Sequence, residues 1–227
     1  MSTPLDTQLQ QIGQVQPHLP GVVSVLLGLL AGVIGAVPLA WALVRHVDTI
    51  AHEGAHAIMA SSLGHKIGGI EVKRNGDGGT RVPTVRSRGA GVAIGAVGYL
   101  GPSAFGLGAA WLISAGHIEA VLWLGLALLV MLLPLTRGWF AVTAVAATGF
   151  ALYWVATRAT LTEQTVSAYG VAWLLLVSGV RTVLEHGRGA RDAGILRDLS
   201  LLPRGFWSAI WLAATAAALA FGGRLLV

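Results

Sequence analysis

Long apolar stretches follow one another along most of the chain, with short polar segments between them. A helix needs about 20 mainly apolar residues to cross the hydrocarbon core of a bilayer. Seven stretches approach that length, and they cover residues 21–44, 45–63, 89–114, 118–133, 139–157, 166–184 and 206–226. The pattern predicts an all-α polytopic membrane protein with about six or seven transmembrane helices.

Residues 64–88 interrupt this pattern. Residues 66–73 and 80–82 mix β-branched and polar side chains, and Asn75-Gly-Asp-Gly-Gly79 between them favours a turn. This predicts a small β-hairpin at the membrane surface. Residues 1–20 are polar and lack the basic stretch of a cleaved signal peptide. We therefore expect a polar N-terminal segment over 1–20 and a single integral-membrane domain over 21–227.

The composition agrees with a membrane protein. Hydrophobic residues make up 55% of the chain, charged residues make up 11%, and the mean hydropathy is +0.72. A soluble domain carries about 25% charged residues, so a soluble enzyme is excluded, and so is a disordered chain. The net charge of +5 would suit a nucleic-acid-binding protein. In so apolar a chain we interpret it as loop charge, and we expect a multi-pass cell-membrane protein, in contact with the lipid bilayer, with no nucleic-acid partner.

The distribution of basic residues predicts an orientation. With seven spans, Arg45, Arg158 and Arg224 fall on one side of the membrane, and the other twelve of the 15 basic residues fall on the opposite side. Those twelve lie in residues 64–88 and 181–204 and at Arg137. Basic loops favour the cytoplasm. This places the N-terminus and both loops in the cytoplasm and the C-terminus outside.

The sequence Ala51-His-Glu-Gly-Ala-His-Ala57 contains a His-Glu-x-x-His motif. On a helix, His52 and His56 lie one turn apart on the same face, so both imidazoles can reach one zinc ion while Glu53 serves as general base. Ionisable residues inside an apolar span are costly and are usually functional. The alternative is an interfacial helix whose polar face is solvated, but the apolar residues around the motif favour the zinc site.

Two histidines do not complete a catalytic zinc site, which typically has three protein ligands. The chain has no cysteine, so the third ligand must offer nitrogen or oxygen. His65 lies beyond the predicted helix end, and the topology puts His117 on the far side. The remaining candidates are Glu185, His186, Asp192 and Asp198, and charge and spacing alone do not choose among these four.

Several motifs resemble those of the site-2 protease family of intramembrane zinc metallopeptidases, in particular its short bacterial branch without a PDZ domain. In order, they are Ala51-His-Glu-Gly-Ala-His-Ala57, Leu63-Gly64, Gly78-Gly-Thr80, Gly98-Tyr-Leu-Gly-Pro102 and Arg191-Asp-Ala-Gly-Ile-Leu-Arg-Asp-Leu-Ser-Leu-Leu-Pro203. The resemblance implies that Asp192 is the third zinc ligand. The family's Asn-Pro and Asp-Gly pairs around this aspartate are absent here, and Asp198 is the reserve ligand.

The resemblance implies a metalloprotease-like domain that hydrolyses peptide bonds within or next to transmembrane segments of membrane-protein substrates. Zn²⁺ would be held by His52, His56 and Asp192, and Glu53 would be the base. A substrate helix must unwind locally, because its carbonyls are hidden in its own hydrogen bonds. We expect the edge of the hairpin to bind the unwound strand by β-addition.

Three other interpretations concern single residues or the activity itself. Asp48 lies one turn before His52 and could accept its second N–H or pair with Arg45. Ser103 with His52 faintly resembles a rhomboid protease, but the order of serine and histidine spans is reversed. The main rival function is a non-proteolytic metal-binding membrane protein, either a transporter or an inactive family member that binds partners.

Overall fold

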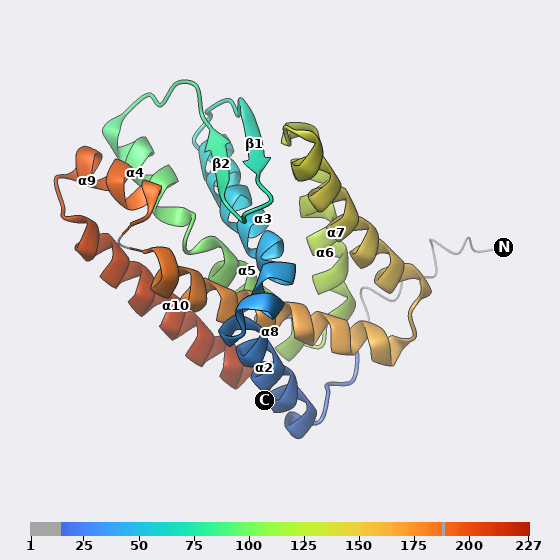
Figure 1. The fold of residues 1–227 in the computed structure, drawn as a ribbon. Helices are drawn as coiled ribbons and strands as arrows, with labels where there is room; N and C mark the ends of the chain where they lie inside the picture. The colour runs from blue at the N-terminus through green and yellow to red at the C-terminus, as the bar shows by residue number, and fades with distance from the viewer. Residues whose placement is uncertain (1–14, 188) are drawn as a thin grey trace.

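The computed structural model describes residues 15–187 and 189–227. Helices dominate the described residues, and a two-stranded hairpin lies over one end of the bundle (Figure 1). The elements, in chain order, are α2 (Gly21–Ala36), α3 (Pro38–Ser62), β1 (Gly69–Val72), β2 (Gly78–Arg81), α4 (Arg88–Val97), α5 (Gly101–Ser114), α6 (Ile118–Leu132), the short 3₁₀ helix η1 (Leu133–Leu135), α7 (Trp139–Arg158), α8 (Leu161–His186), α9 (Arg191–Ser200) and α10 (Arg204–Leu226).

Four helices of the described residues are each long and apolar enough to cross a membrane. They are Ile118–Leu135, which joins α6 to η1, and α7, α8 and α10. Two bent pairs also qualify when each pair is taken together, α2 with α3 at 103° and α4 with α5 at 63°. If each bent pair forms one span, the total is six. The predicted polytopic all-α fold is therefore confirmed, with the first two predicted spans forming one bent pair.

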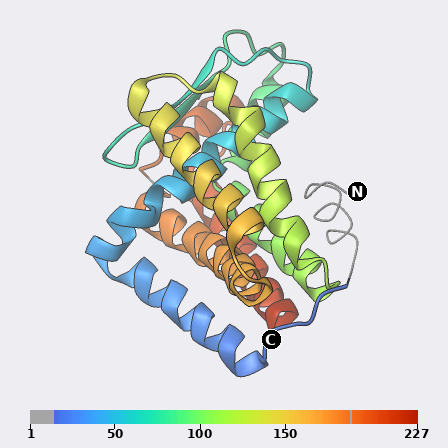
Figure 2. The ribbon, with the colours of Figure 1, turned by 90° about the vertical axis from the view of Figure 1, so that its right-hand side faces the viewer.

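The break between α2 and α3 lies at Val37, seven residues before the predicted boundary. Val37 has extended backbone angles, and Pro38 begins α3. Proline has no N–H to donate and disfavours a helical residue before it, so the helix must stop here even though the side chains stay apolar. Figure 2 shows the resulting change of direction between the two helices. Apolar length alone does not reveal such a break.

The bend changes which end of the molecule carries the start of the chain. We call the end with residues 64–88, 133–138 and 189–203 the hairpin end, and the end with residues 115–117, 159–160 and 227 the far end. The Gln16 backbone N–H donates to the Gly116 carbonyl, and Gly21 packs against Val227. The described start of the chain therefore lies at the far end, beside the C-terminus. The expectation that the N-terminus shares a side with the hairpin is wrong for these residues, because α2 and α3 do not each cross the bundle.

Arg45 also lies on the other side from the one predicted. Its guanidinium donates to the Arg74 carbonyl in the hairpin turn at 2.8 Å, so it belongs to the hairpin end. Among the described basic residues, this leaves only Arg158 and Arg224 at the far end. The charge asymmetry between the two ends is therefore larger than the sequence count indicated.

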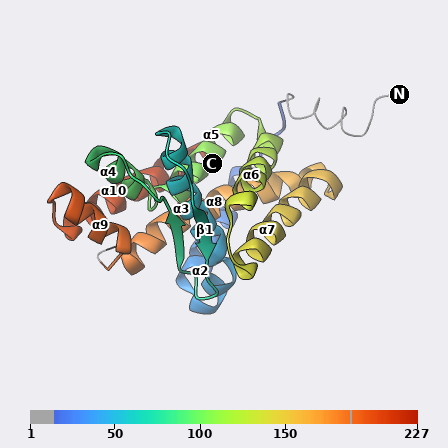
Figure 3. The ribbon, with the colours of Figure 1, turned by 90° about the horizontal axis from the view of Figure 1, so that it is seen from above.

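The predicted hairpin is confirmed, with β1 and β2 pairing antiparallel so that Ile70 faces Thr80 and Val72 faces Gly78. Ile70 and Val72 are buried, and the same face of the hairpin covers α3. Seen from above, the hairpin lies over α3, with α4 and α9 on one side and α6 and α7 on the other (Figure 3). The hairpin is thus placed directly over the helix that carries the His-Glu-x-x-His motif.

The centre of the bundle is formed by α5 packed along α8. Tyr169 and Leu176 of α8 and Ile113 of α5 are completely buried there. A second cluster holds α9 in place, because Ala193 and Leu196 pack with Trp211 of α10. This second cluster fixes the helix that carries Asp192.

A candidate metal centre beneath the hairpin

Helix α3 presents two rows of functional side chains, each with a four-residue spacing that puts its members on one face. Arg45, Thr49 and Glu53 form one row, and all three make hydrogen bonds to the hairpin or its turn. Asp48, His52 and His56 form the other row, which faces α4, α8 and α9. His52 belongs to one row and Glu53 to the other, and the two residues are adjacent in sequence. The hairpin contacts and the histidines therefore lie at the same turn of α3.

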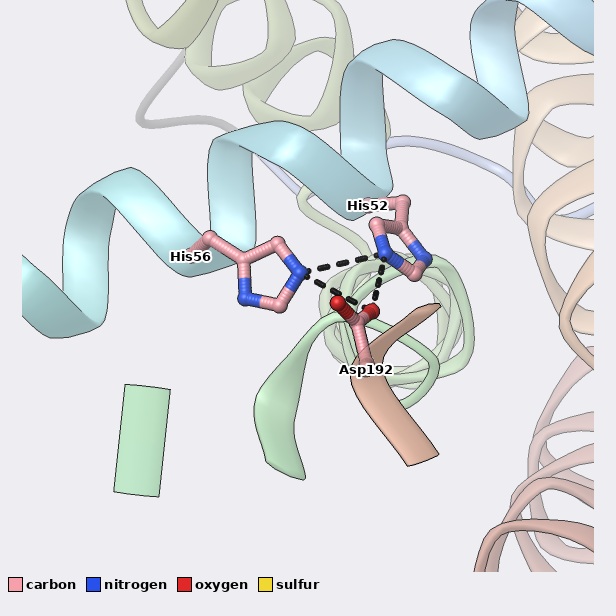
Figure 4. A group of neighbouring side chains, drawn as sticks. All are labelled: His52, His56 and Asp192. Atoms are coloured by element: carbon pink, nitrogen blue, oxygen red, sulfur yellow. Dashed lines mark hydrogen bonds and ion pairs between the residues drawn. The ribbon is translucent and has the colours of Figure 1, made fainter. Parts of the chain in front are cut away.

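His52 and His56 converge on Asp192 (Figure 4). The Asp192 Oδ2 atom lies 3.0 Å from His52 Nε2 and 3.3 Å from His56 Nε2, and the two Nε2 atoms are 3.1 Å apart. One ligand atom from each residue lies within 4.8 Å of the other two. Residues 136 and 140 positions apart in sequence are therefore brought together into one donor set.

Asp192 owes its position to the first turn of α9. Burial opposes the charge of its carboxyl group, but hydrogen bonds from His52 and His56 outweigh burial and hold the pKa of Asp192 well below its usual range. The carboxylate therefore stays ionised at neutral pH, which is the state that a metal ligand needs.

The orientation of His56 is fixed by a backbone contact. Its Nδ1 atom lies 2.6 Å from the Ile94 carbonyl of α4, which can only accept a hydrogen bond. Nδ1 must therefore carry a proton. Nε2 donates to Asp192 while the ring is doubly protonated, and once that second proton is released the Nε2 lone pair is free to bind a metal ion. Hydrogen bonding of the second ring nitrogen in this way is typical of metal-ligating histidines.

Space beside the two imidazoles is kept open by Gly98, in the break between α4 and α5. A Cβ atom at this position would collide with the Nε2 atoms of both His52 and His56. Tyr99, the next residue, packs its ring against the edge of His52 at 4.7 Å between centroids and stacks on Trp211. Residues 98 and 99 therefore shape the site, although neither offers a ligand.

Glu53 is buried and is bound to the hairpin. Its Oε2 atom accepts a hydrogen bond from the Thr80 hydroxyl at 2.8 Å, and the same hydroxyl lies 3.0 Å from the Glu53 backbone carbonyl. Gly78 lies against the other carboxylate oxygen, where any side chain would collide with it. Glu53 was expected from the His-Glu-x-x-His motif, whereas the contact that Thr80 makes with it was not, and the Gly78-Gly-Thr80 sequence was its only signal.

One cavity of about 1080 Å³ is lined by His52, Glu53, His56, Asp192 and the first three residues of β2, Gly78 to Thr80. The outer edge of β2 is open, because β1 is its only partner strand in the described part of the chain. The Ile70 carbonyl accepts from the Arg137 N–H on the other side of β1, so Ile70 and its partner Thr80 point their backbone groups away from each other. The N–H and C=O of Thr80 therefore lie along the free edge.

The other candidates for a third ligand do not join the two histidines, although Glu185 and His186 line the same cavity. Asp198 is exposed and pairs with Arg197 at 2.7 Å, and Glu185 pairs with Arg181 at 2.6 Å. His186 is 56% exposed beside Glu185, and His117 precedes α6 at the far end. Of the candidates that the sequence left open, Asp192 alone joins the two histidines within the described residues.

The structure also places Asp48 and Ser103, the two other residues for which the sequence offered an interpretation. The Asp48 carboxylate accepts from the Thr182 hydroxyl at 2.8 Å, and neither His52 nor Arg45 is its partner. Ser103 is buried against Gly179 of α8, far from a role as nucleophile, and its hydroxyl has no hydrogen-bond partner among residues 15–187 and 189–227. Spacing along α3 suggested the contacts of Asp48 with His52 and Arg45. It carries no information about α8, which packs against α3 and supplies Thr182 as the hydrogen-bond donor.

The donor set fits a zinc ion. Two imidazole nitrogens and one carboxylate oxygen are the ligands of many catalytic zinc sites, which leave a fourth position open. The fixed tautomer of His56 and the space next to Gly98 meet two further requirements of such a site. A zinc ion bound there would have Glu53 lining the same cavity.

Comparison with known proteins identifies a family. No curated protein and no solved structure matches the chain. A family model described as Peptidase M50B-like matches residues 24–222, which include both helices that carry the candidate ligands. The chain therefore belongs to the peptidase M50B-like group of the site-2 protease family of membrane peptidases.

Proposed function

We propose that this protein is an intramembrane zinc metalloendopeptidase that cleaves membrane-protein substrates within or next to their transmembrane segments. The observation that carries the proposal is the convergence of His52, His56 and Asp192 in a cavity that also contains Glu53. Membership of a peptidase family supports hydrolysis as the chemistry.

The residues have distinct roles in this mechanism. His52, His56 and Asp192 would hold the zinc ion, which would polarise the scissile carbonyl and make nearby water easier to deprotonate. Glu53 takes a proton from the attacking water as its oxygen forms a bond to the carbonyl carbon. When the C–N bond breaks, Glu53 returns that proton to the leaving amine, so it ends in its starting state.

The free edge of β2 supports binding of the substrate in extended form. The backbone N–H and C=O of Thr80 can pair with an unwound substrate segment, as in β-strand addition. Such pairing would expose the substrate's carbonyls, which a helix keeps in its own hydrogen bonds. The same edge borders the cavity with the three candidate ligands, so the bound strand would pass close to Glu53.

The proposal is tested with purified wild type, His52→Ala and Glu53→Gln, measuring zinc content and cleavage of a panel of single-span membrane substrates. Wild type and Glu53→Gln should bind about one zinc per chain, His52→Ala should lose most of it, and only wild type should cleave. Loss of the base should lower the rate by about 10²-fold or more.

The matched controls are His117→Ala, a histidine at the far end, and Glu71→Gln, an exposed glutamate on β1. Both should retain zinc and cleavage. Zinc binding by wild type without cleavage of any substrate would favour a non-proteolytic metal-binding protein. Absence of zinc from wild type would contradict both functions.

A further inference from the structure

A hydrogen bond between Thr80 and Glu53 links the hairpin to the carboxylate of the expected base. The Thr80 side chain points from β2 toward α3, and its hydroxyl lies 2.8 Å from Glu53 Oε2. A carboxylate can only accept, so the hydroxyl donates. Such a charge-assisted bond is stronger than one between neutral groups, and it fixes the direction of the side chain.

The other contacts of the row on α3 keep β2 in register for this bond. The Thr49 hydroxyl lies 2.7 Å from the Gly76 carbonyl, one helical turn before Glu53. Arg45 donates to the Arg74 carbonyl one turn earlier still. The hairpin is therefore attached to α3 at three successive turns, and only the last attachment involves a group expected to act in catalysis.

The two carboxylate oxygens of Glu53 differ in their surroundings because Thr80 bonds only one of them. Oε2 is engaged by the hydroxyl, whereas Oε1 lies against Gly78, which has no side chain to fill the space. No hydrogen bond to Oε1 is formed within the described residues, so Oε1 is the oxygen left for the attacking water. At the same time, the backbone of Thr80 lies at the free edge of β2, where an extended substrate can pair.

We propose that Thr80 is a positioning residue that aims the Glu53 carboxylate through its hydroxyl while its backbone binds the substrate strand. This inference rests on the proposed function and deepens it. A substrate strand paired with Thr80 is held in fixed register to the base, because both contacts belong to the same residue. Proper aim of a catalytic group can contribute 10-fold or more to a rate, since small misplacements are costly.

The test compares Thr80→Val, which keeps the shape but removes the hydroxyl, with Thr80→Ser, which keeps the hydroxyl. Thr143→Val is the matched control, because Thr143 is exposed on α7 and its hydroxyl donates to the Trp139 carbonyl of its own helix. For Thr80→Val we expect kcat to fall about 10-fold or more, with KM within about 3-fold of wild type and zinc content unchanged. Thr80→Ser should restore most of kcat, and the control should match wild type.

A second readout does not depend on activity. In metal-free protein, Thr80→Val should speed amide hydrogen exchange in β2, and Glu53→Ala should do so to a lesser extent, because the backbone carbonyl of Glu53 remains as an acceptor. The double variant should exchange no faster than Thr80→Val alone, since both changes remove the same bond. Additive effects of the two changes would overturn the proposed link.

The outcomes separate this inference from the proposed function. If wild type does not cleave, the proposed function fails. If wild type cleaves and Thr80→Val keeps its kcat, or raises KM alone, Thr80 does not aim the base and only this inference fails. Failure of Thr80→Ser to restore kcat would also overturn it. If Thr80→Val does not fold, Thr80→Ala against Thr80→Ser makes the same comparison.

Discussion

At the scale of single residues, the candidate site depends on a side chain that is missing. Gly98 faces the two imidazoles at the point where a Cβ atom would collide with both Nε2 atoms. The glycine does not serve backbone freedom, since its φ of −53° and ψ of −57° are helical and open to any residue. Its value is the space that it leaves for whatever His52 and His56 bind.

We therefore expect Gly98→Ala to weaken zinc binding at least about 10-fold, or about 1.4 kcal/mol, and to abolish most cleavage. The added methyl group must displace the histidines from their convergent arrangement. Gly108→Ala on α5 is the control, because no atom of the described residues lies within 4 Å of its added Cβ. Zinc titration of both metal-free variants checks this. Equal zinc affinities of the two variants would show that the metal does not need the space next to Gly98.

At the scale of helices, the bundle is held by close backbone approach between α5 and α8. A Cβ atom on Gly106 would lie 2.9 Å from the backbone nitrogen of Leu176 and 3.1 Å from the carbonyl oxygen of Ala172. Backbone atoms cannot move aside as a flexible side chain can. Small residues at such contacts let membrane helices pack closely, where the hydrophobic effect contributes little.

Gly106→Ala should consequently destabilise the protein by about 1–3 kcal/mol, although alanine is the better helix former. Gly108→Ala, two residues away on the same helix and without a neighbour, should be neutral or slightly stabilising. Unfolding in detergent micelles, followed by circular dichroism, measures both. An unchanged stability of Gly106→Ala would mean that α5 and α8 can separate without cost.

At the scale of the whole molecule, the bent pairs decide which segments share an end. The described start of the chain and the C-terminus lie together at the far end, and the hairpin and α9 lie at the other. Since Arg158 and Arg224 are the only described basic residues at the far end, we propose that the hairpin end faces the cytoplasm.

Because the chain has no cysteine, single cysteines can report this arrangement without background labelling. Val15→Cys and Thr162→Cys should react with an impermeant thiol reagent from the outside, and Asp77→Cys in the hairpin turn only from the cytoplasmic side. All three positions are exposed. Labelling of Val15→Cys from the same side as Asp77→Cys would contradict the bent arrangement of α2 and α3.

Much of the fold could be predicted from the sequence because a bilayer imposes a simple length rule. The later spans, from residue 118 onward, were predicted to within a few residues, and Asn75-Gly-Asp-Gly-Gly79 correctly predicted a hairpin turn. The first two spans were not, because Pro38 breaks the helix inside an apolar stretch. The proline ended the helix even though the side chains around it are apolar. The start of the described chain therefore lies at the opposite end of the bundle from the one that the hydrophobic pattern predicted.

The sequence by itself determined the pair of imidazoles and the neighbouring glutamate, because helical spacing places His52 and His56 on one face without help from the rest of the chain. Only the tertiary structure decided what joins them. Asp192 is 136 residues from His56, and the packing of α9 on α10 and α4 brings its carboxylate to the histidines while Asp198 stays exposed. Thr80 and Gly98 act through positions that spacing along one helix cannot specify, since each reaches the site from a different segment of the chain.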